Sequence, residues 1–271
     1  MQTIVALTNA FEGIASLHIL QIRDQVLQSQ VFFGELWQIY RQVRVDQLFH
    51  YGRTASGAKV INKELMILIS SEGGLSGDID HRLVDQAVSH YQAVANDIIV
   101  VGHHGSLLLA QHGVPAVKSF KLPTRDLDIN VLPLVAEVQR YAKTTVFYQH
   151  YSSLAVQQVQ SIAVNAAVEE LAKNVQPGGD LITESNYIFE PSTYAVVSHL
   201  ERTMIQIALS QTILDSKLAQ YASRFRAMTL AHSKSSDLFD DAQLRYVRAK
   251  RRLHDERLKE VINGLRGREL L

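Results

Sequence analysis

Residues 191–271 read PSTYAVVSHL ERTMIQIALS QTILDSKLAQ YASRFRAMTL AHSKSSDLFD DAQLRYVRAK RRLHDERLKE VINGLRGREL L, and this stretch decides the fold. After Pro191 it contains no proline, and its only glycines are Gly264 and Gly267, near its end. With Gln211 as the single interruption, apolar residues recur at alternating steps of three and four: Val197, Leu200, Met204, Ile207, Leu214, Leu218, Tyr221, Phe225 and Met228. This period of 3.5 residues predicts the a/d seam of a coiled coil.

The same register continues toward the C-terminus, which favours one unbroken helix. After His232 and Ser235 it lands on Phe239, Ala242, Tyr246, Ala249 and Leu253. About 75 helical residues at a rise of 1.5 Å make a rod of roughly 110 Å. A compact globule of this chain length is only about 45–50 Å across. We therefore expect the rod to protrude from the rest of the molecule.

The N-terminal region offers a partner for this rod. Apolar residues repeat the three/four spacing in two groups, Ile4, Leu7, Phe11 and Ile14, and then Phe33, Leu36, Tyr40 and Val43. We interpret residues 3–50 as a second long helix, antiparallel to the first. Taken alone, this stripe would also suit a helix buried in an ordinary bundle.

The middle of the chain has the pattern of a small α/β domain. Strands are expected at residues 64–70, 97–101, 116–121, 144–151 and 159–166, and helices at 80–95, 106–112 and 129–142. Such alternation predicts a mostly parallel, Rossmann-like sheet that is covered on both faces. The predicted fold class is thus α/β, with a long antiparallel coiled coil. Its domains are an N-terminal helix (1–55), a head (63–175) and a C-terminal helix (190–271).

Composition excludes several classes of function. The chain has 271 residues, 46% of them hydrophobic, with 27 basic and 27 acidic side chains. Such a balance argues against nucleic-acid or membrane-surface binding through net charge. Without cysteine there is no disulfide, zinc thiolate site or cysteine nucleophile. The start lacks a signal or transit pattern, and unbroken apolar runs such as 65–69 are short, so we expect membrane contact only through partners.

Few residues suggest chemistry. The turn 73–78, GGLSGD, follows a strand and precedes a helix, but it lacks the Gly-Lys-Ser/Thr ending of a phosphate loop and the nucleophile-elbow pattern. An α/β enzyme centred on Ser76 or on the turn amides stays an alternative. We expect His103 and His104 to be solvated residues at a helix start, and Asp126 and Asp128 to be loop carboxylates. No catalytic, cofactor-binding or metal-binding residue is predicted.

A basic run near the C-terminus is the stronger candidate for binding. Its cations are Arg245, Arg248, Lys250, Arg251, Arg252, Arg257 and Lys259. The a/d seam fails beyond Leu253, where the in-register positions are Glu256 and Glu260. Two interpretations are open: a solvated helix end that frays, or a tip that leaves its partner helix and enters an acidic or apolar socket in another protein.

Four stretches, in order along the chain, resemble the gamma subunits of F-type ATP synthases. Residues 69–77, ISSEGGLSG, are similar to the family's Ser-Thr/Ser-x-x-Gly-Leu-Cys-Gly element, with serine for cysteine. Residues 101–105, VGHHG, are similar to a strand ending in Gly-x-Lys/Arg-Gly. Residues 187–191, YIFEP, resemble the Tyr/Phe-Glu-Pro entry to the terminal helix, and residues 224–231, RFRAMTLA, match Arg-x-x-Ala-Met-x-x-Ala. The resemblance covers essentially the whole chain.

The resemblance implies a non-catalytic, rotating central stalk without a cofactor. Its implied partners are the alpha and beta subunits, whose hexamer encloses the coiled coil, and the epsilon subunit and c ring beneath the head. The implied location is the cytoplasmic face of a bacterial inner membrane. The candidate interface residues are Arg224, Met228, Lys250, Arg251, Arg252, Arg257, Tyr187 and Phe189.

The sequence departs from the family's pattern at several points. Residues 19–24, ILQIRD, replace a Lys-Ile-Thr-x-Ala-Met type of run, and Ala219-Gln220 replaces Ser-Glu. Lys250-Arg251 replaces Arg-Gln where the family contacts the hexamer. Two alternatives therefore stay open beside the synthase: the shaft of a rotary ATPase specialised for hydrolysis, and an unrelated coiled-coil scaffold.

Overall fold

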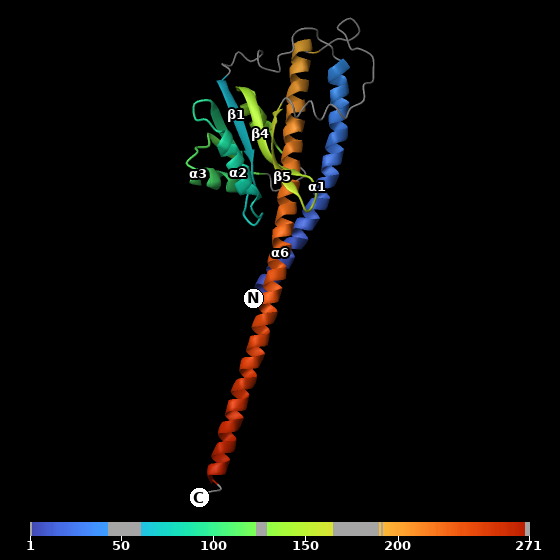
Figure 1. Cartoon of the computed structure of the whole chain (residues 1–271). Helices are drawn as coiled ribbons and strands as arrows, with labels where there is room; N and C mark the ends of the chain where they lie inside the picture. Colours follow the sequence, from blue (N-terminus) through green and yellow to red (C-terminus); the bar gives the residue numbers. More distant parts are fainter. Residues whose placement is uncertain (1, 43–60, 123–128, 165–189, 191, 269–271) are drawn as a thin grey trace.

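Two long helices form the spine of the molecule (Figure 1). The computed structural model describes residues 2–42, 61–122, 129–164, 190 and 192–268. Helix α1 runs from Gln2 to Gln42, and helix α6 runs unbroken for 76 residues, from Thr193 to Arg268. The prediction of a single C-terminal helix is therefore confirmed. Of the predicted N-terminal helix, residues 43–50 lie outside the described residues.

The two helices lie side by side and antiparallel (Figure 1). His18 stacks on Tyr221, with ring centroids 4.5 Å apart and an interplanar angle of 3°. Nearer the N-terminus, Thr229 donates a hydrogen bond of 3.0 Å to Glu12, and the Thr8 hydroxyl lies 3.3 Å from His232 Nδ1. Because residue numbers rise on one helix as they fall on the other, the predicted antiparallel pairing is confirmed.

The face of α1 that packs on α6 differs from the predicted stripe. Thr8, Ala15 and Ile22, spaced by seven, are buried. Leu7 and Ile14, one position earlier in each repeat, are 55% and 50% exposed, so the prediction that they face α6 is wrong. The face of α1 that is buried against α6 thus includes the small side chains of Thr8 and Ala15.

One segment of α1 is long and apolar enough to cross a membrane by length and composition. It spans Val5–Ile22, 18 residues of which 17% are buried. Signal sequences and core helices of other proteins share these properties. Here the segment contacts α6 along one face through Thr8, Glu12 and His18, so we assign it to the helix pair.

A five-stranded sheet forms the core of the head, which we define as residues 61–122 and 129–164. Its strands are β1 (Ile61–Ile69), β2 (Asn96–Val101), β3 (Lys118–Phe120), β4 (Tyr141–Tyr151) and β5 (Gln157–Ala163). Their order is β3-β2-β1-β4-β5, and only β5 runs antiparallel to its neighbour. The mostly parallel sheet is thus confirmed.

Apolar clusters cover both faces of the sheet. Along β1, Leu65, Ile67 and Ile69 point to one cluster, and Met66 and Leu68 point to the other, as side chains of a strand alternate. Helices α2 (Ile79–His90) and α3 (His103–Gln111) cover the second face. A strand that is buried on both faces reads as the unbroken apolar run seen in the sequence.

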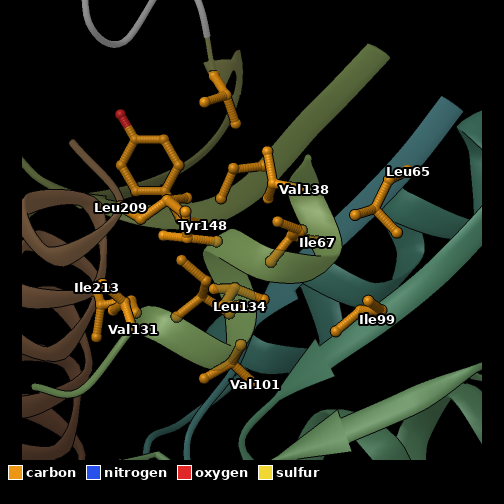
Figure 2. Close-up of a cluster of buried hydrophobic side chains, with 14 of the residues drawn as sticks. Leu65, Ile67, Ile99, Val101, Val131, Leu134, Val138, Tyr148, Leu209 and Ile213 are labelled. Carbon is orange, nitrogen blue, oxygen red and sulfur yellow. The ribbon is translucent and has the colours of Figure 1, made fainter. Parts of the chain in front are cut away.

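Helix α6, which we call the shaft, covers part of the first face of the sheet. Leu209 and Ile213 of α6 pack with Val131 and Leu134, at the start of the short helix α4 (Leu132–Val138) (Figure 2). The predicted helix over 129–142 is too long, because Tyr141 already begins β4. The core of the head therefore includes side chains of α6. Leu209 lies more than 45 residues after the end of β5 in the sequence.

Candidate partner-binding surface

The C-terminal part of α6 extends past the end of its partner helix (Figure 1). Because Thr8 lies beside His232 and the helices are antiparallel, Gln2, the first residue of α1, lies near residue 238 of α6. From residue 241 to 262, every side chain that the structure describes is exposed. We call residues 241–268 the tip. The last positions of the a/d register, such as Tyr246 and Leu253, are therefore exposed in the structure.

The tip carries both charge and apolar surface. Its cations include Lys250, Arg251, Arg252 and Arg257, all exposed. Its exposed apolar side chains are Leu244, Tyr246, Val247, Leu253, Leu258, Val261 and Ile262. One ion pair within the tip, Arg245 Nη2 to Asp241 Oδ2 at 2.7 Å, links successive turns. A surface of this kind suits a socket that is partly acidic and partly apolar.

Two other predicted interface residues are engaged within the chain. Arg224 donates to Ser76 Oγ at 3.2 Å, and its guanidinium carbon lies 5.7 Å from the centroid of the Tyr221 ring. Met228 is 7% exposed. Tyr187 and Phe189 lie outside the described residues, as do Asp126 and Asp128.

The turn after β1 contacts α6. Ser76 is 2% exposed, and its carbonyl accepts a hydrogen bond of 2.6 Å from Ser223 of α6. Its hydroxyl is the acceptor for Arg224, and no histidine contacts it among the hydrogen bonds of the described residues. Leu75 beside it has a φ of 70°, a strained conformation for a residue with a Cβ. These contacts make Ser76 a joint between head and shaft.

The two adjacent histidines have different environments. His103 is exposed, as predicted. The prediction is wrong for His104, because its Nδ1 lies 2.9 Å from Oδ2 of Asp80, a residue that is 1% exposed. The start of α3 turns this ring inward over α2. Among the described residues, no group of three His, Asp or Glu side chains is placed to hold a metal ion.

A second histidine–carboxyl pair ties β4 to α6. His150 Nδ1 lies 2.7 Å from Asp215 Oδ2, and the Tyr151 N–H donates to Asp215 Oδ1 at 3.1 Å. Burial raises the pKa of the Asp215 carboxyl, and the contacts with His150 and the Tyr151 amide offset this only in part. The pair thus adds a polar contact between β4 of the head and α6.

The carboxyl ends of β1 and β4 are where open α/β sheets usually bind ligands. In this chain α6 crosses that edge, and Ser216 and Gln220 are buried there against Gln149 of β4. Sequence reasoning missed these residues. The only signal was a group of polar side chains, Ser216, Lys217 and Gln220, within the helix that carries the apolar seam.

The match to a family model settles the relationship of this chain to known proteins. The family described as ATP synthase matches residues 1–266. The chain belongs to the ATP synthase family. The resemblance found in the motifs is thereby confirmed.

Curated relatives within the ATP synthase family carry the name gamma chain. The ATP synthase gamma chain of Chlorobaculum parvum is 23% identical over 274 residues, which cover 95% of this chain and 91% of that protein. The ATP synthase gamma chain of Staphylococcus epidermidis is 26% identical over 218 residues, 75% of this chain and 73% of that protein.

Solved structures similar to this member of the family belong to rotary assemblies. A chain of the central stalk and c ring of the Tetrahymena thermophila mitochondrial ATP synthase matches with a TM-score of 0.56 and 18% identity, over 83% of this chain and 99% of that one. A chain of the Euglena gracilis mitochondrial ATP synthase matches with a TM-score of 0.55 and 15% identity, over 98% of this chain and 94% of that one. At these identities the likeness concerns the fold.

Proposed function

We propose that this chain is the rotating central-stalk (gamma) subunit of an F-type ATP synthase. The observation that carries the proposal is the tip, the part of α6 that extends beyond α1 with every described side chain exposed from residue 241 to 262. Membership of the ATP synthase family and relatives named gamma chain give that tip a partner. Family membership also removes the unrelated scaffold from consideration.

The proposed mechanism is mechanical. The tip and the helix pair enter the bore of the hexamer of alpha and beta subunits, and the head rests on the epsilon subunit and the c ring. Ion flow turns the ring and the stalk turns with it. ATP is made or hydrolysed on the beta subunits, so this chain is a non-catalytic subunit without a cofactor. The differences between the faces that the stalk presents shift each beta subunit between its states.

The finer features of the stalk belong to the same proposal. We assign residues 1–55 and 190–271 to a left-handed coiled coil, and residues 63–175 to a Rossmann-like head. Packing of α1 on α6 through residues spaced by seven supports the first, and the order of the parallel strands supports the second. The assembly is held at the cytoplasmic face of a bacterial inner membrane through its partners.

The residues proposed to contact the hexamer are Lys250, Arg251, Arg252 and Arg257 of the tip. Their exposed cationic side chains suit carboxylates in the bore. Arg224 and Met228 are proposed to shape the helix pair where it enters the bore, and Tyr187 and Phe189 to contact partners near the start of α6.

Co-expression tests the proposed function. The chain is produced with alpha and beta subunits, and the purified complex is weighed by native mass spectrometry. We expect one copy per hexamer, and its absence from the complex would contradict the proposal.

In the intact synthase, the double charge reversal Lys250→Glu/Arg251→Glu should weaken ATP-driven proton pumping. The control is Lys121→Glu, a reversal of an exposed charge on the head.

A further inference from the structure

A connected set of buried polar side chains links the head to the shaft. We call it the head–shaft network, and its members are Ser71, Asp80, His104, Gln149, Ser216 and Gln220. It lies at the carboxyl ends of β1 and β4, on the edge of the sheet that α6 crosses. No role in partner binding accounts for these residues, since five of the six are nearly inaccessible to solvent.

Asp80 anchors the network in the head. It is 1% exposed, and both of its side-chain oxygens are occupied. Oδ2 accepts a hydrogen bond from the Ser71 hydroxyl and contacts His104 Nδ1, while Oδ1 accepts one of 2.8 Å from Gln149 Nε2. The orientation of the Gln149 amide is therefore fixed from the side of the head.

Gln149 passes this orientation to the shaft. The residue is fully buried, and its Oε1 accepts hydrogen bonds from the Ser216 hydroxyl and from Gln220 Nε2, the latter 3.2 Å away. Gln220 Nε2 also lies 3.1 Å from Ser216 Oγ. One amide thus joins α2 of the head to one face of α6.

Two further kinds of contact join the head to α6: apolar contacts of Leu209 and Ile213, and polar contacts of Asp215, Ser223 and Arg224 with residues of the head. Apolar contacts are non-directional, so they resist separation better than they resist sliding or rotation. Hydrogen bonds require defined directions. Ser216 and Gln220 are four residues apart and so lie on one face of α6. A rotation of α6 about its axis would turn both donors away from the buried Gln149 oxygen, and an unsatisfied buried acceptor is costly.

We propose that the head–shaft network fixes the rotational register between head and shaft, so that torque passes between them without slip. The proposal rests on the proposed function, because only a rotating stalk carries torque across this joint. Gln149, Ser216 and Gln220 are positioning residues in this scheme, and they need not touch alpha, beta or any nucleotide.

Single-molecule rotation tests the proposal. The hexamer containing the full chain is immobilised, and a bead is attached to the head through Gln111→Cys, an exposed site in a chain without native cysteine. The angular variance of the bead is measured during the pauses of ATP-driven rotation. We expect Gln149→Met to raise this variance above the wild-type value, with ATP hydrolysis by the hexamer unchanged.

Two further variants make the test specific. Thr145 lies on the same strand as Gln149, but its hydrogen bond of 2.6 Å goes to Glu64 of β1, within the head. Thr145→Val removes that bond and should therefore leave the variance at the wild-type value. Ser216→Ala/Gln220→Met breaks the network from the shaft and guards against misfolding of the β4 variant. Combined with Gln149→Met, it should add little, because both changes break one link.

Wild-type variance in both Gln149→Met and Ser216→Ala/Gln220→Met would overturn the proposal while leaving the proposed function intact. Failure of the wild-type chain to assemble with alpha and beta subunits would overturn the proposed function and the inference with it.

Discussion

Gly102 lies where the start of helix α3 approaches the end of strand β1. Its φ is +105°, and a Cβ at this position would collide with the carbonyl group of Ser70. Three residues on, Gly105 donates its N–H to Ser70 Oγ at 2.9 Å, and a Cβ there would collide with the same hydroxyl. The Gly-x-x-Gly spacing is thus a packing requirement of the head.

Replacement of Gly102 tests this packing. Gly102→Ala combines an unfavourable φ with a backbone collision, so we expect it to lower the free energy of unfolding by about 3 kcal/mol. Gly73→Ala is the control, because a Cβ added at Gly73 would meet no atom within 4 Å. Chemical denaturation of both variants measures the difference. Equal stability of the two would contradict this account of the spacing.

Glu64 gives the head a defined response to acid. Burial favours the neutral carboxyl, but hydrogen bonds from Thr145, Lys143 and Asn96 outweigh it and lower the pKa of Glu64. The unfolded chain then binds this proton more readily than the folded chain, so stability is present at neutral pH and is lost as the pH falls below about 4.

The expected result is a loss of stability on acidification that depends on this side chain. Glu64→Gln should flatten the fall in unfolding free energy between about pH 5 and about pH 3, measured by denaturant titration at each pH. Thr145→Val, which removes one hydrogen bond to the carboxylate, should flatten it in part. A Glu64→Gln profile parallel to that of the wild type would contradict the assignment.

At the scale of the element, α6 has two halves with different environments. Buried side chains recur as far as Met228, and from residue 241 to 262 every described side chain is exposed. The first half holds the fold together, since it packs against α1 and the sheet. The second half contributes no described side chain to the core.

Truncation separates the two halves. Deletion of everything after Asp240 should leave the melting temperature of the isolated chain within about 2 °C of wild type, because no buried side chain of the described residues is lost. The same deletion should weaken assembly with the hexamer. As a control, Met204→Ala removes a side chain that is 2% exposed and should cost about 2–5 kcal/mol. A large loss of stability on truncation would show that the tip packs in solution.

At the scale of the whole molecule, the shape departs from that of a globule. The 76 residues of α6 give a rod of about 114 Å, while a compact chain of this length is about 45–50 Å across. Small-angle X-ray scattering should give a maximum dimension of at least about 110 Å. Truncation after Asp240 removes the 28 helical residues from 241 to 268 and should shorten it by about 40 Å. A maximum dimension near that of a globule for the full chain would contradict an extended α6.

Much of the fold could be predicted because it depends on local periodicity. A helix without proline and with apolar residues at steps of three and four can be recognised from sequence, and so can the buried run of β1. The buried face of α1 could not be predicted. Leu7 and Thr8 are neighbours in the sequence and point to different faces of the helix, and only the position of α6 decides which of the two is buried. The length of α4 was also missed, because Tyr141 joins β4 through pairing with a distant strand.

The amino-acid sequence by itself determined the unbroken α6, the alternating head and the basic tip, since each follows from the order of neighbouring residues. The tertiary structure alone decided where α1 ends along α6, which of two histidines turns inward, and how Gln149 joins Asp80 to Ser216. These features are contacts between segments far apart in the chain, and a hydrogen bond forms only when both partners have been brought to the same place with the right direction.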